Sequence, residues 1–321
     1  MTGAARTRRE QRPAEPRPRP PEPISTRRPA RAGTLRRSTA LVVAALLSTA
    51  GALTPAHAAA PASAAPPTAP SLSCDYDTPG VPVLVPGDLR VYPGCPLGYT
   101  VVLGDLHVLP EAGLTFRGRV AGDVHVAEVA SLLLQGAEVG GGVHLDRATE
   151  LTVLQSTVGR SIRGKAQQMA VDQSVVHGAI NVATRQTAPW ELRVRGTWVG
   201  GWVNLHTGQV RVIASVLRRG LTASWAHGVQ VCASEIGADV VVRHAQRAVR
   251  VGGPAWQGDC VTGPTARPVQ VGGDVQILDN DDPVALEALA VTGDLLCTGN
   301  RAAPALGAVT VAGARSGQCA G

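Results

Sequence analysis

Short runs of alternating apolar and polar residues recur along the chain at a nearly constant spacing. The clearest run is a five-residue phrase, seen as G-D-L-H-V from Gly104, G-D-V-H-V from Gly122 and G-G-V-H-L from Gly141. Related copies begin at Arg160, Gly178, Gly201, Arg218, Ala238, Gly273 and Gly293, with a partial copy at Gly313. Successive copies start 17–23 residues apart, except for one interval of 35 residues. A period this regular indicates a repeat architecture.

Each period contains two further short apolar segments. An alternating run comes first, such as L-T-V-L from Leu151, and an apolar residue beside Gly follows, as at Val158-Gly159. Alternation with a period of two predicts strands with one inward face, and Gly permits corners that β-branched residues turn poorly. Three short strands in about 19 residues predict one coil of a single-stranded parallel β-helix. We therefore expect an all-β solenoid of about 11 coils.

The residues before Cys74 do not carry the repeat. Residues 1–37 contain eleven Arg and three Glu with little apolar content, which predicts a disordered leader. Residues 38–58 are uncharged and combine an apolar run with A-H-A before Ala59, which is typical of a signal peptide cleaved after Ala58. Residues 59–73 are expected to be an Ala/Pro linker and residues 74–321 the β-helix domain.

Two other interpretations of the leader remain open. The apolar run could be an uncleaved membrane anchor, although it is short for a bilayer span and Pro55 follows it. The pair Arg36-Arg37 also permits export by the twin-arginine route instead of the general secretory route. We expect a secreted or cell-envelope protein with no stable membrane span after cleavage.

The positive charge of the chain belongs to the leader. The formal net charge is +6, but residues 59–321 contain 19 basic and 21 acidic residues. A nucleic-acid partner therefore loses its main support. With only five Trp, three Tyr and one Phe, a narrow core of aliphatic side chains is expected.

The cysteines predict disulfides. All six follow Ala58 in an exported chain, an even number that predicts three bonds. Pairing of sequence neighbours is one of fifteen connectivities, and we favour it because each loop would close over about one coil. Cys74–Cys95 and Cys297–Cys319 would then clamp the two ends, and Cys232–Cys260 would hold the base of a loop inserted at about 251–269. Clamped ends argue against end-to-end polymers, so a monomer is expected.

Two sets of side chains are candidate binding sites. In stacked coils, Asp105, His107, Asp123, His125 and His144 would share one outward surface, and carboxylates with imidazoles could bind a divalent metal. The alternative is a solvated face of paired charges. Exposed Trp198, Trp202 and Trp225 could stack on sugar rings, or they could cover corners of the coils.

No motif in the sequence predicts a reaction. The sequence has no C-x-x-C, G-x-S-x-G, H-E-x-x-H or phosphate-binding loop, and its only lysine is Lys165. Because parallel β-helices also occur in polysaccharide-degrading enzymes, the fold alone keeps an enzyme open. We expect no cofactor and no catalytic residues.

The repeats resemble two groups of proteins. The phrase G-D-L-L-C-T-G-N from Gly293 and the final S-G-Q-C at Ser316–Cys319 resemble uncharacterised secreted bacterial β-solenoid repeat proteins, over residues 74–319. A looser similarity runs to the bactofilins, polymer-forming β-helices with G-x-I/V-x-V strands. The signal peptide and the cysteine-closed ends depart from that family. The first resemblance implies a secreted solenoid and no particular activity.

The sequence therefore favours a secreted, non-catalytic β-solenoid. It would act as a structural scaffold or surface-interaction module at the bacterial cell envelope, with an envelope glycan or protein as its partner. The alternative is a carbohydrate-binding or polysaccharide-degrading β-helix protein.

Overall fold

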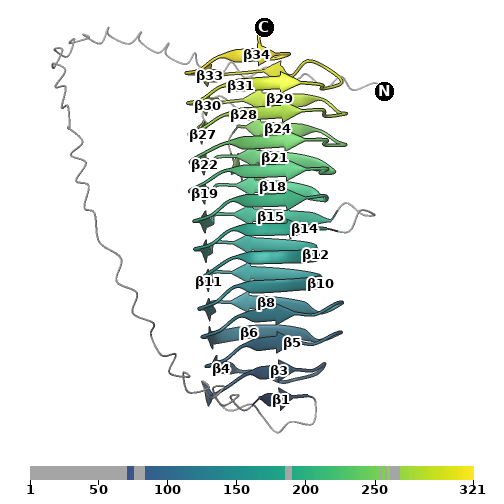
Figure 1. Ribbon diagram of the computed structural model, residues 1–321, viewed down its shortest axis with the longest axis vertical. Helices are drawn as coiled ribbons and strands as arrows, with labels where there is room; N and C mark the ends of the chain where they lie inside the picture. The colour runs from purple at the N-terminus through teal and green to yellow at the C-terminus, as the bar shows by residue number, and fades with distance from the viewer. Residues whose placement is uncertain (1–70, 76–83, 185–189, 254, 257–258, 261–267) are drawn as a thin grey trace, which may run out of the picture. The chain divides into compact units, whose positions relative to one another are not determined.

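The computed structural model describes residues 71–75, 84–184, 190–253, 255–256, 259–260 and 268–321. The expected leader, the signal peptide and residues 59–70 of the linker lie outside these ranges. Every helix or strand in the described ranges is a β-strand, and all of the strands belong to one compact unit, Ala64–Gly321. The chain is a parallel β-solenoid of about 12 turns, which confirms the expected fold (Figure 1).

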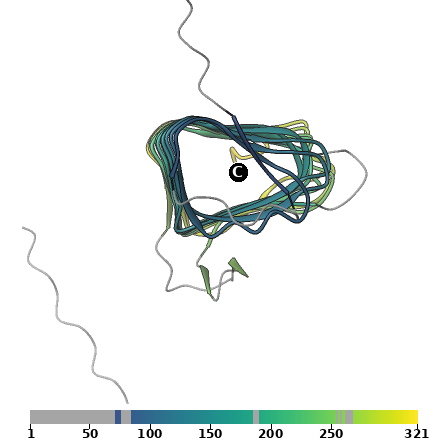
Figure 2. The ribbon, with the colours of Figure 1, turned by 90° about the horizontal axis from the view of Figure 1, so that it is seen from below.

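Three faces of stacked parallel strands make up the solenoid (Figure 2). The first face holds β1 (Leu72–Cys74), β3 (Leu89–Val91), β5 (Leu106–Val108), β7 (Val124–Val126), the starts of β10 (Val143–Leu154) and β12 (Ile162–Asp172), β14 (Ile180–Ala183), β17 (Val203–His206), β20 (Leu221–Ser224), β23 (Val240–Arg243), β28 (Val275–Leu278), β31 (Leu295–Thr298) and β34 (Arg315–Gly317).

The second and third faces complete each coil. The second holds the start of β6 (Gly113–Val120), β8 (Ser131–Gln135), the ends of β10 and β12, β15 (Glu191–Arg195), β18 (Gln209–Ile213), β21 (Gly228–Cys232), β24 (Val249–Gly252), β29 (Val284–Glu287) and β32 (Ala305–Leu306). The third holds β2 (Leu84–Val85), β4 (Tyr99–Val102), the end of β6, β9 (Glu138–Val139), β11 (Thr157–Val158), β13 (Val175–Val176), β16 (Trp198–Val199), β19 (Val216–Leu217), β22 (Glu235–Ile236), β27 (Val269–Val271), β30 (Leu289–Val291) and β33 (Val309–Val311).

The stack begins earlier than the first repeat that we identified. Asp88 to Val91 continue a phrase G-D-L-R-V from Gly87, and β3 pairs in register with β5 one coil later. Strand β1 pairs with β3 in turn, one coil earlier again. The expected number of about 11 coils was therefore slightly low.

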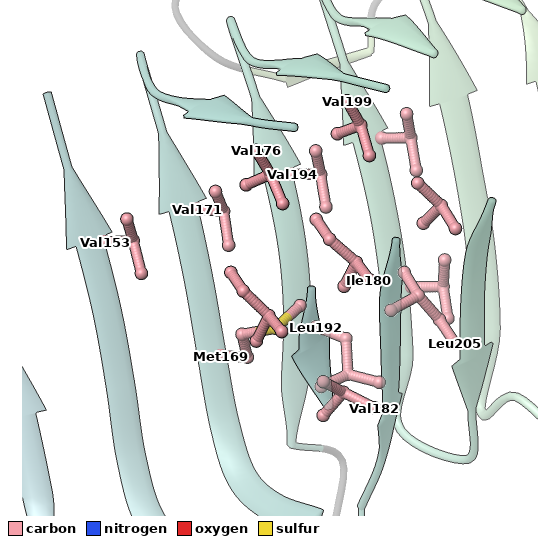
Figure 3. Close-up of a cluster of buried hydrophobic side chains, with 14 of the residues drawn as sticks. Val153, Met169, Val171, Val176, Ile180, Val182, Leu192, Val194, Val199 and Leu205 are labelled. Atoms are coloured by element: carbon pink, nitrogen blue, oxygen red, sulfur yellow. The ribbon is translucent and has the colours of Figure 1, made fainter. Parts of the chain in front are cut away.

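The core is a set of ladders of aliphatic side chains (Figure 3). Along the first face, Val124, Val143, Ile162 and Ile180 occupy equivalent positions in successive coils, and each is 0% exposed. The next residue along each strand, such as His125 after Val124 and His144 after Val143, is only partly buried. Because side chains alternate across a strand, this pattern confirms the expected inward and outward register.

Serine and threonine form an internal ladder at the corner between the second and third faces. The backbone N–H of Ser156 donates to Ser174 Oγ at 3.2 Å, and the N–H of Ser174 donates to Thr197 Oγ1 at 3.4 Å. The ladder runs through Ser156, Ser174, Thr197, Ser215 and Ser234, all buried. Gln155 and Gln173, which precede the first two of them, have φ of 49°. These hydroxyls satisfy buried N–H groups that a tight corner would otherwise leave unpaired.

At the corner between the third and first faces, the Asp side chains of the Gly-Asp phrase form a second ladder of hydrogen bonds between coils. Asp105 Oδ1 accepts the backbone N–H of Asp123 at 2.8 Å, and Asp123 Oδ1 accepts the N–H of Gly142 at 2.7 Å. A Cβ added to Gly122 would lie 2.1 Å from Asp105 Oδ1. The repeat thus requires Gly for close approach and Asp as an acceptor between coils.

Disulfides hold both ends of the solenoid, as expected. Cys74 in β1 bonds to Cys95, and Cys297 in β31 bonds to Cys319. Cys319 is 0% exposed, and the C-terminus projects onto the middle of the cross-section in Figure 2. The last residues therefore cover part of the end of the core.

The inserted loop is shorter than expected. Val251 lies in β24 and Val269 in β27, both 0% exposed, so the insertion begins after Gly252 and ends before Val269. Within it, β25 (Ala255–Trp256) and β26 (Asp259–Cys260) pair antiparallel.

Peptide mapping without reduction tests the disulfide connectivity. Cys232 is disulfide-bonded, whereas the side chain of Cys260 lies outside the described residues, so their pairing stays a prediction. We expect three linked peptide pairs, Cys74–Cys95, Cys232–Cys260 and Cys297–Cys319. A peptide that links Cys232 to any cysteine other than Cys260 would contradict the expected disulfide at the base of the inserted loop.

Candidate functional site

A groove of about 660 Å³ lies on the first face, over β5, β7, β10, β12 and β14. Its polar lining comes from successive coils and consists of His107, His125, His144, Asp146, Arg163, Lys165 and Asn181. Parallel pairing places His107, His125, His144, Arg163 and Asn181 at equivalent outward positions. One surface therefore collects these side chains although they are about one repeat apart in the sequence.

Three imidazoles stack along the groove. The ring centroids of His107 and His125 are 4.8 Å apart with an interplanar angle of 10°, and those of His125 and His144 are 4.9 Å apart at 15°. This spacing matches the separation of about 4.8 Å between neighbouring strands, so the register itself produces the stack.

His144 lies between a carboxylate and a guanidinium. Its Nε2 is 3.3 Å from Asp123 Oδ2, and its Nδ1 accepts a hydrogen bond from Arg163 Nε at 2.8 Å. Nδ1 thus serves as an acceptor, and Nε2 faces the carboxylate. The backbone N–H of Gly142, and then His144, lower the pKa of Asp123 against the opposing effect of burial.

Two of the predicted metal ligands, Asp105 and Asp123, form hydrogen bonds with other groups of the chain. Asp105 and Asp123 each commit Oδ1 to the backbone of the next coil. Asp105 Oδ2 is 3.8 Å from His125 Nε2, a loose pairing. Among the described residues, no group of three or more His, Cys, Asp or Glu side chains is arranged to hold a metal ion. The five predicted ligands thus share one surface without forming a metal shell.

The three candidate tryptophans do not form one platform. Trp198 lies on the third face and contacts His177 edge to face at 5.7 Å. Trp202 precedes β17 at the corner between the third and first faces, and its ring covers Gly220. Trp225 lies at the corner between the first and second faces, 51% exposed and stacked on His244 at 4.2 Å. A sugar-binding surface built from all three is not supported by this arrangement.

The sequence interpretation missed the basic part of the groove. Arg163, Lys165 and Asn181 lie beside the histidines because β12 and β14 continue the same ladder. The signal was present, since R-S-I-R-G from Arg160 aligns Arg163 with His144 in the repeat. It was overlooked because the candidate ligands were chosen among carboxylates and imidazoles alone.

His107 makes the stability of the fold depend on pH. Burial is the main cause that lowers its pKa from the ordinary 6.5, His125 and Arg90 add to it, and Asp88 and Asp105 oppose it. Since the unfolded chain then binds the proton more readily, this group's contribution is complete above about pH 6.5 and is lost as the pH falls below it.

Thermal melts measure this dependence. We expect the midpoint to fall on acidification from about pH 8 to about pH 5.5, and His107→Asn to make the fall shallower. An unchanged slope in His107→Asn would contradict the assignment.

Comparisons with known proteins found no match to the chain among family models, curated proteins or solved structures. Within the described ranges, no helix has the length and apolar character needed to cross a membrane.

Proposed function

We propose that this protein is a secreted, non-catalytic β-solenoid that acts as a rigid scaffold and surface-interaction module at the bacterial cell envelope. The observation that carries the proposal is the groove on the first face, displayed on a stack whose corners are tied coil to coil by hydrogen bonds. Such a stack holds side chains of five successive coils in fixed register, as an extended binding surface requires.

Two features support export. The disulfides at both ends fit an oxidising compartment, and residues 38–58 have the pattern of a signal peptide. The resemblance to secreted bacterial solenoid proteins points the same way.

The bonding within the groove supports a binding role over a catalytic one. Both ring nitrogens of His144 have partners, and Asp123 is held by the next coil. A general base needs a nitrogen or oxygen free to reach a substrate proton, whereas His144 and Asp123 place these atoms on partners within the chain.

Cleavage of a polysaccharide is the alternative from a different class. The groove itself favours it, because an elongated surface suits a polymer substrate. Incubation with acidic and neutral polysaccharides distinguishes the two: we expect no new reducing ends and no unsaturated products. Release of either would support the enzyme instead.

Cell fractionation tests export. In a bacterial host, the chain with a C-terminal tag is expected in the envelope or medium, with Ala59 as its first residue. Leu46→Arg should hold it inside by interrupting the apolar run, whereas Thr68→Arg in the linker should not. Wild-type protein found in the cytoplasm with its leader intact would overturn the proposal.

A further inference from the structure

Two cations in the groove on the first face have no acidic partner in the described part of the chain. Arg163 and Lys165 both project outward from β12 and are exposed. Arg163 uses Nε on His144, and the guanidinium has four further N–H donors. Among the described residues, no carboxylate oxygen lies within 4.0 Å of either cation. Both charges are therefore available to a ligand.

The nearby acidic groups have partners other than the two cations. Asp146 lines the groove, and its Oδ1 lies 3.5 Å from Arg147 Nε, a guanidinium that it shares with Glu128 Oε2 at 2.8 Å. Asp123 accepts the Gly142 N–H and lies beside His144. Among the described residues, the groove cations without a carboxylate partner thus lie on β12.

The remaining lining is neutral and mixed. Asn181 and the imidazole edges offer hydrogen bonds, while Leu109, Ala127 and Ala183 offer apolar surface. The equivalent positions from His107 to Asn181 extend over four strand spacings, about 19 Å. This surface suits an elongated chain that carries hydroxyls, C–H surfaces and widely spaced anionic groups.

Charge density separates the candidate polymers. A polyphosphate or nucleic acid has a charge on every unit and would bring some of them against Asp105 and Asp123, at the edge of the histidine stack. A polysaccharide with a carboxylate on alternate sugars has more widely spaced charges and many hydroxyls. Two cations beside a polar, uncharged surface fit the second class better.

We propose that this groove binds an acidic polysaccharide, with Arg163 and Lys165 holding its carboxylates and the imidazole edges and Asn181 contacting its hydroxyls. The proposal rests on the proposed function, since it names the partner class of the same surface. Guanidinium–carboxylate bonds are charge-assisted and often bidentate, so Arg163 is expected to contribute most.

Calorimetry with the exported, disulfide-bonded chain tests the proposal, using hyaluronate, which has a carboxylate on alternate sugars, and polygalacturonate and alginate, which have one on every sugar, as probes. We expect at least one to bind, more weakly as salt is raised. The double variant Arg163→Gln/Lys165→Gln should weaken binding by about tenfold or more, because it removes two charge-assisted contacts. Arg250→Gln, which removes a cation from an outward position of β24 on the second face, is the matched control and should leave affinity unchanged.

Each contrary result has a distinct meaning. Failure of all three probes to bind, or full binding by the double variant with an unchanged melting midpoint, would overturn the inference. Equal binding of dextran would show that carboxylates are not recognised, and tighter binding of polyphosphate would reassign the groove to another polymer. Because export is scored separately by fractionation, protein found at the envelope that does not bind these glycans overturns this inference alone.

Discussion

Val143→Asp is expected to lower the free energy of unfolding by about 3–5 kcal/mol, because it places a carboxylate without a partner in the core. Val143 is 0% exposed and lies between Val124 and Ile162 of the neighbouring coils, both also 0% exposed. Its neighbours in this ladder, Val124 and Ile162, are aliphatic and cannot neutralise the new carboxylate. Chemical denaturation measures the loss. The defect should shrink at low pH, where the introduced carboxyl is protonated and neutral.

His144→Ser is the control from the next position of the same strand. It removes the bonds to Arg163 and Asp123, but both partners can return to water, so we expect a loss below about 1 kcal/mol. A larger loss from His144→Ser than from Val143→Asp would contradict the inward and outward register of the first face.

The register of the first face could be predicted from the sequence because its cause is local. Alternation of Leu106, His107 and Val108 is visible in the chain, and stacking at a regular period then places His107, His125 and His144 together. The same alternation extends to the edge of the insertion. Val249, Arg250 and Val251 alternate and pair with β21 and β29, so Val251 belongs to the stack and the predicted start of about 251 was slightly early.

The roles of the polar side chains could be predicted less well, since they depend on bonds between coils. The sequence places Asp105 and Asp123 on an outward surface, which made them candidate ligands. It does not show that Oδ1 of each accepts an N–H from the following coil. In the same way, Asn280 lies in a run of acidic residues typical of an exposed turn, yet it is 1% exposed. Which residue of a turn points inward is decided by the neighbouring coil.

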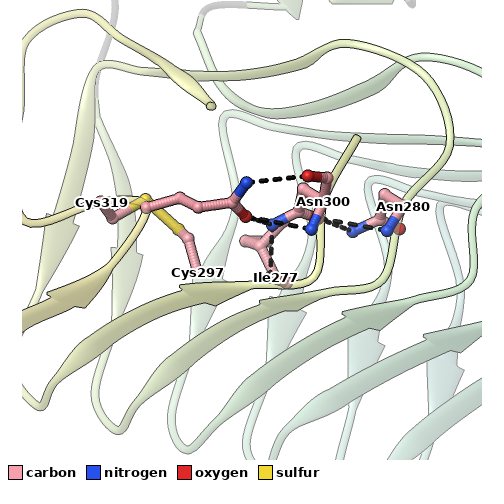
Figure 4. Close-up of a disulfide and its surroundings, with 6 residues drawn as sticks. Ile277, Asn280, Cys297, Asn300 and Cys319 are labelled. Atoms are coloured by element: carbon pink, nitrogen blue, oxygen red, sulfur yellow. Dashed lines mark hydrogen bonds between the residues drawn. A yellow bond between two sulfur atoms is a disulfide. The ribbon is translucent and has the colours of Figure 1, made fainter. Parts of the chain in front are cut away.

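That inward asparagine belongs to a second internal ladder, at the corner between the first and second faces (Figure 4). Asn300 Oδ1 accepts the backbone N–H of Asn280 at 3.2 Å and its side-chain amide at 2.8 Å. Asn300 Nδ2 donates to Ile277 O at 2.9 Å and to Gln318 Oε1 at 3.0 Å. Gln318 is the residue before Cys319, so the amide of Asn300 joins the C-terminal cap to two earlier coils.

Asn300→Leu is expected to lower the free energy of unfolding of the C-terminal coils by about 3 kcal/mol or more. Leucine keeps the approximate size of the side chain but removes the acceptor of the Asn280 backbone N–H and of the Asn280 side-chain amide, and each buried group left without a partner costs about 1–3 kcal/mol. Because a solenoid is stabilised mainly between neighbouring coils, the loss should stay local. Hydrogen exchange should show faster amide exchange in β28, β31 and β34 than in wild type, with β10 and β12 unchanged.

Gln276→Leu is the matched control for the loss of an amide. Gln276 occupies an outward position of β28 and is only partly buried, so its replacement should change the free energy of unfolding by less than about 0.5 kcal/mol. Comparing the two variants distinguishes the effect of the buried hydrogen bonds of Asn300 from the effect of removing an amide side chain near the C-terminal end. Two results would contradict the role of the asparagine ladder: an equal change in amide exchange in both variants, or wild-type exchange rates in β31 and β34 of Asn300→Leu. Either would mean that the Cys297–Cys319 disulfide stabilises the C-terminal end without the ladder.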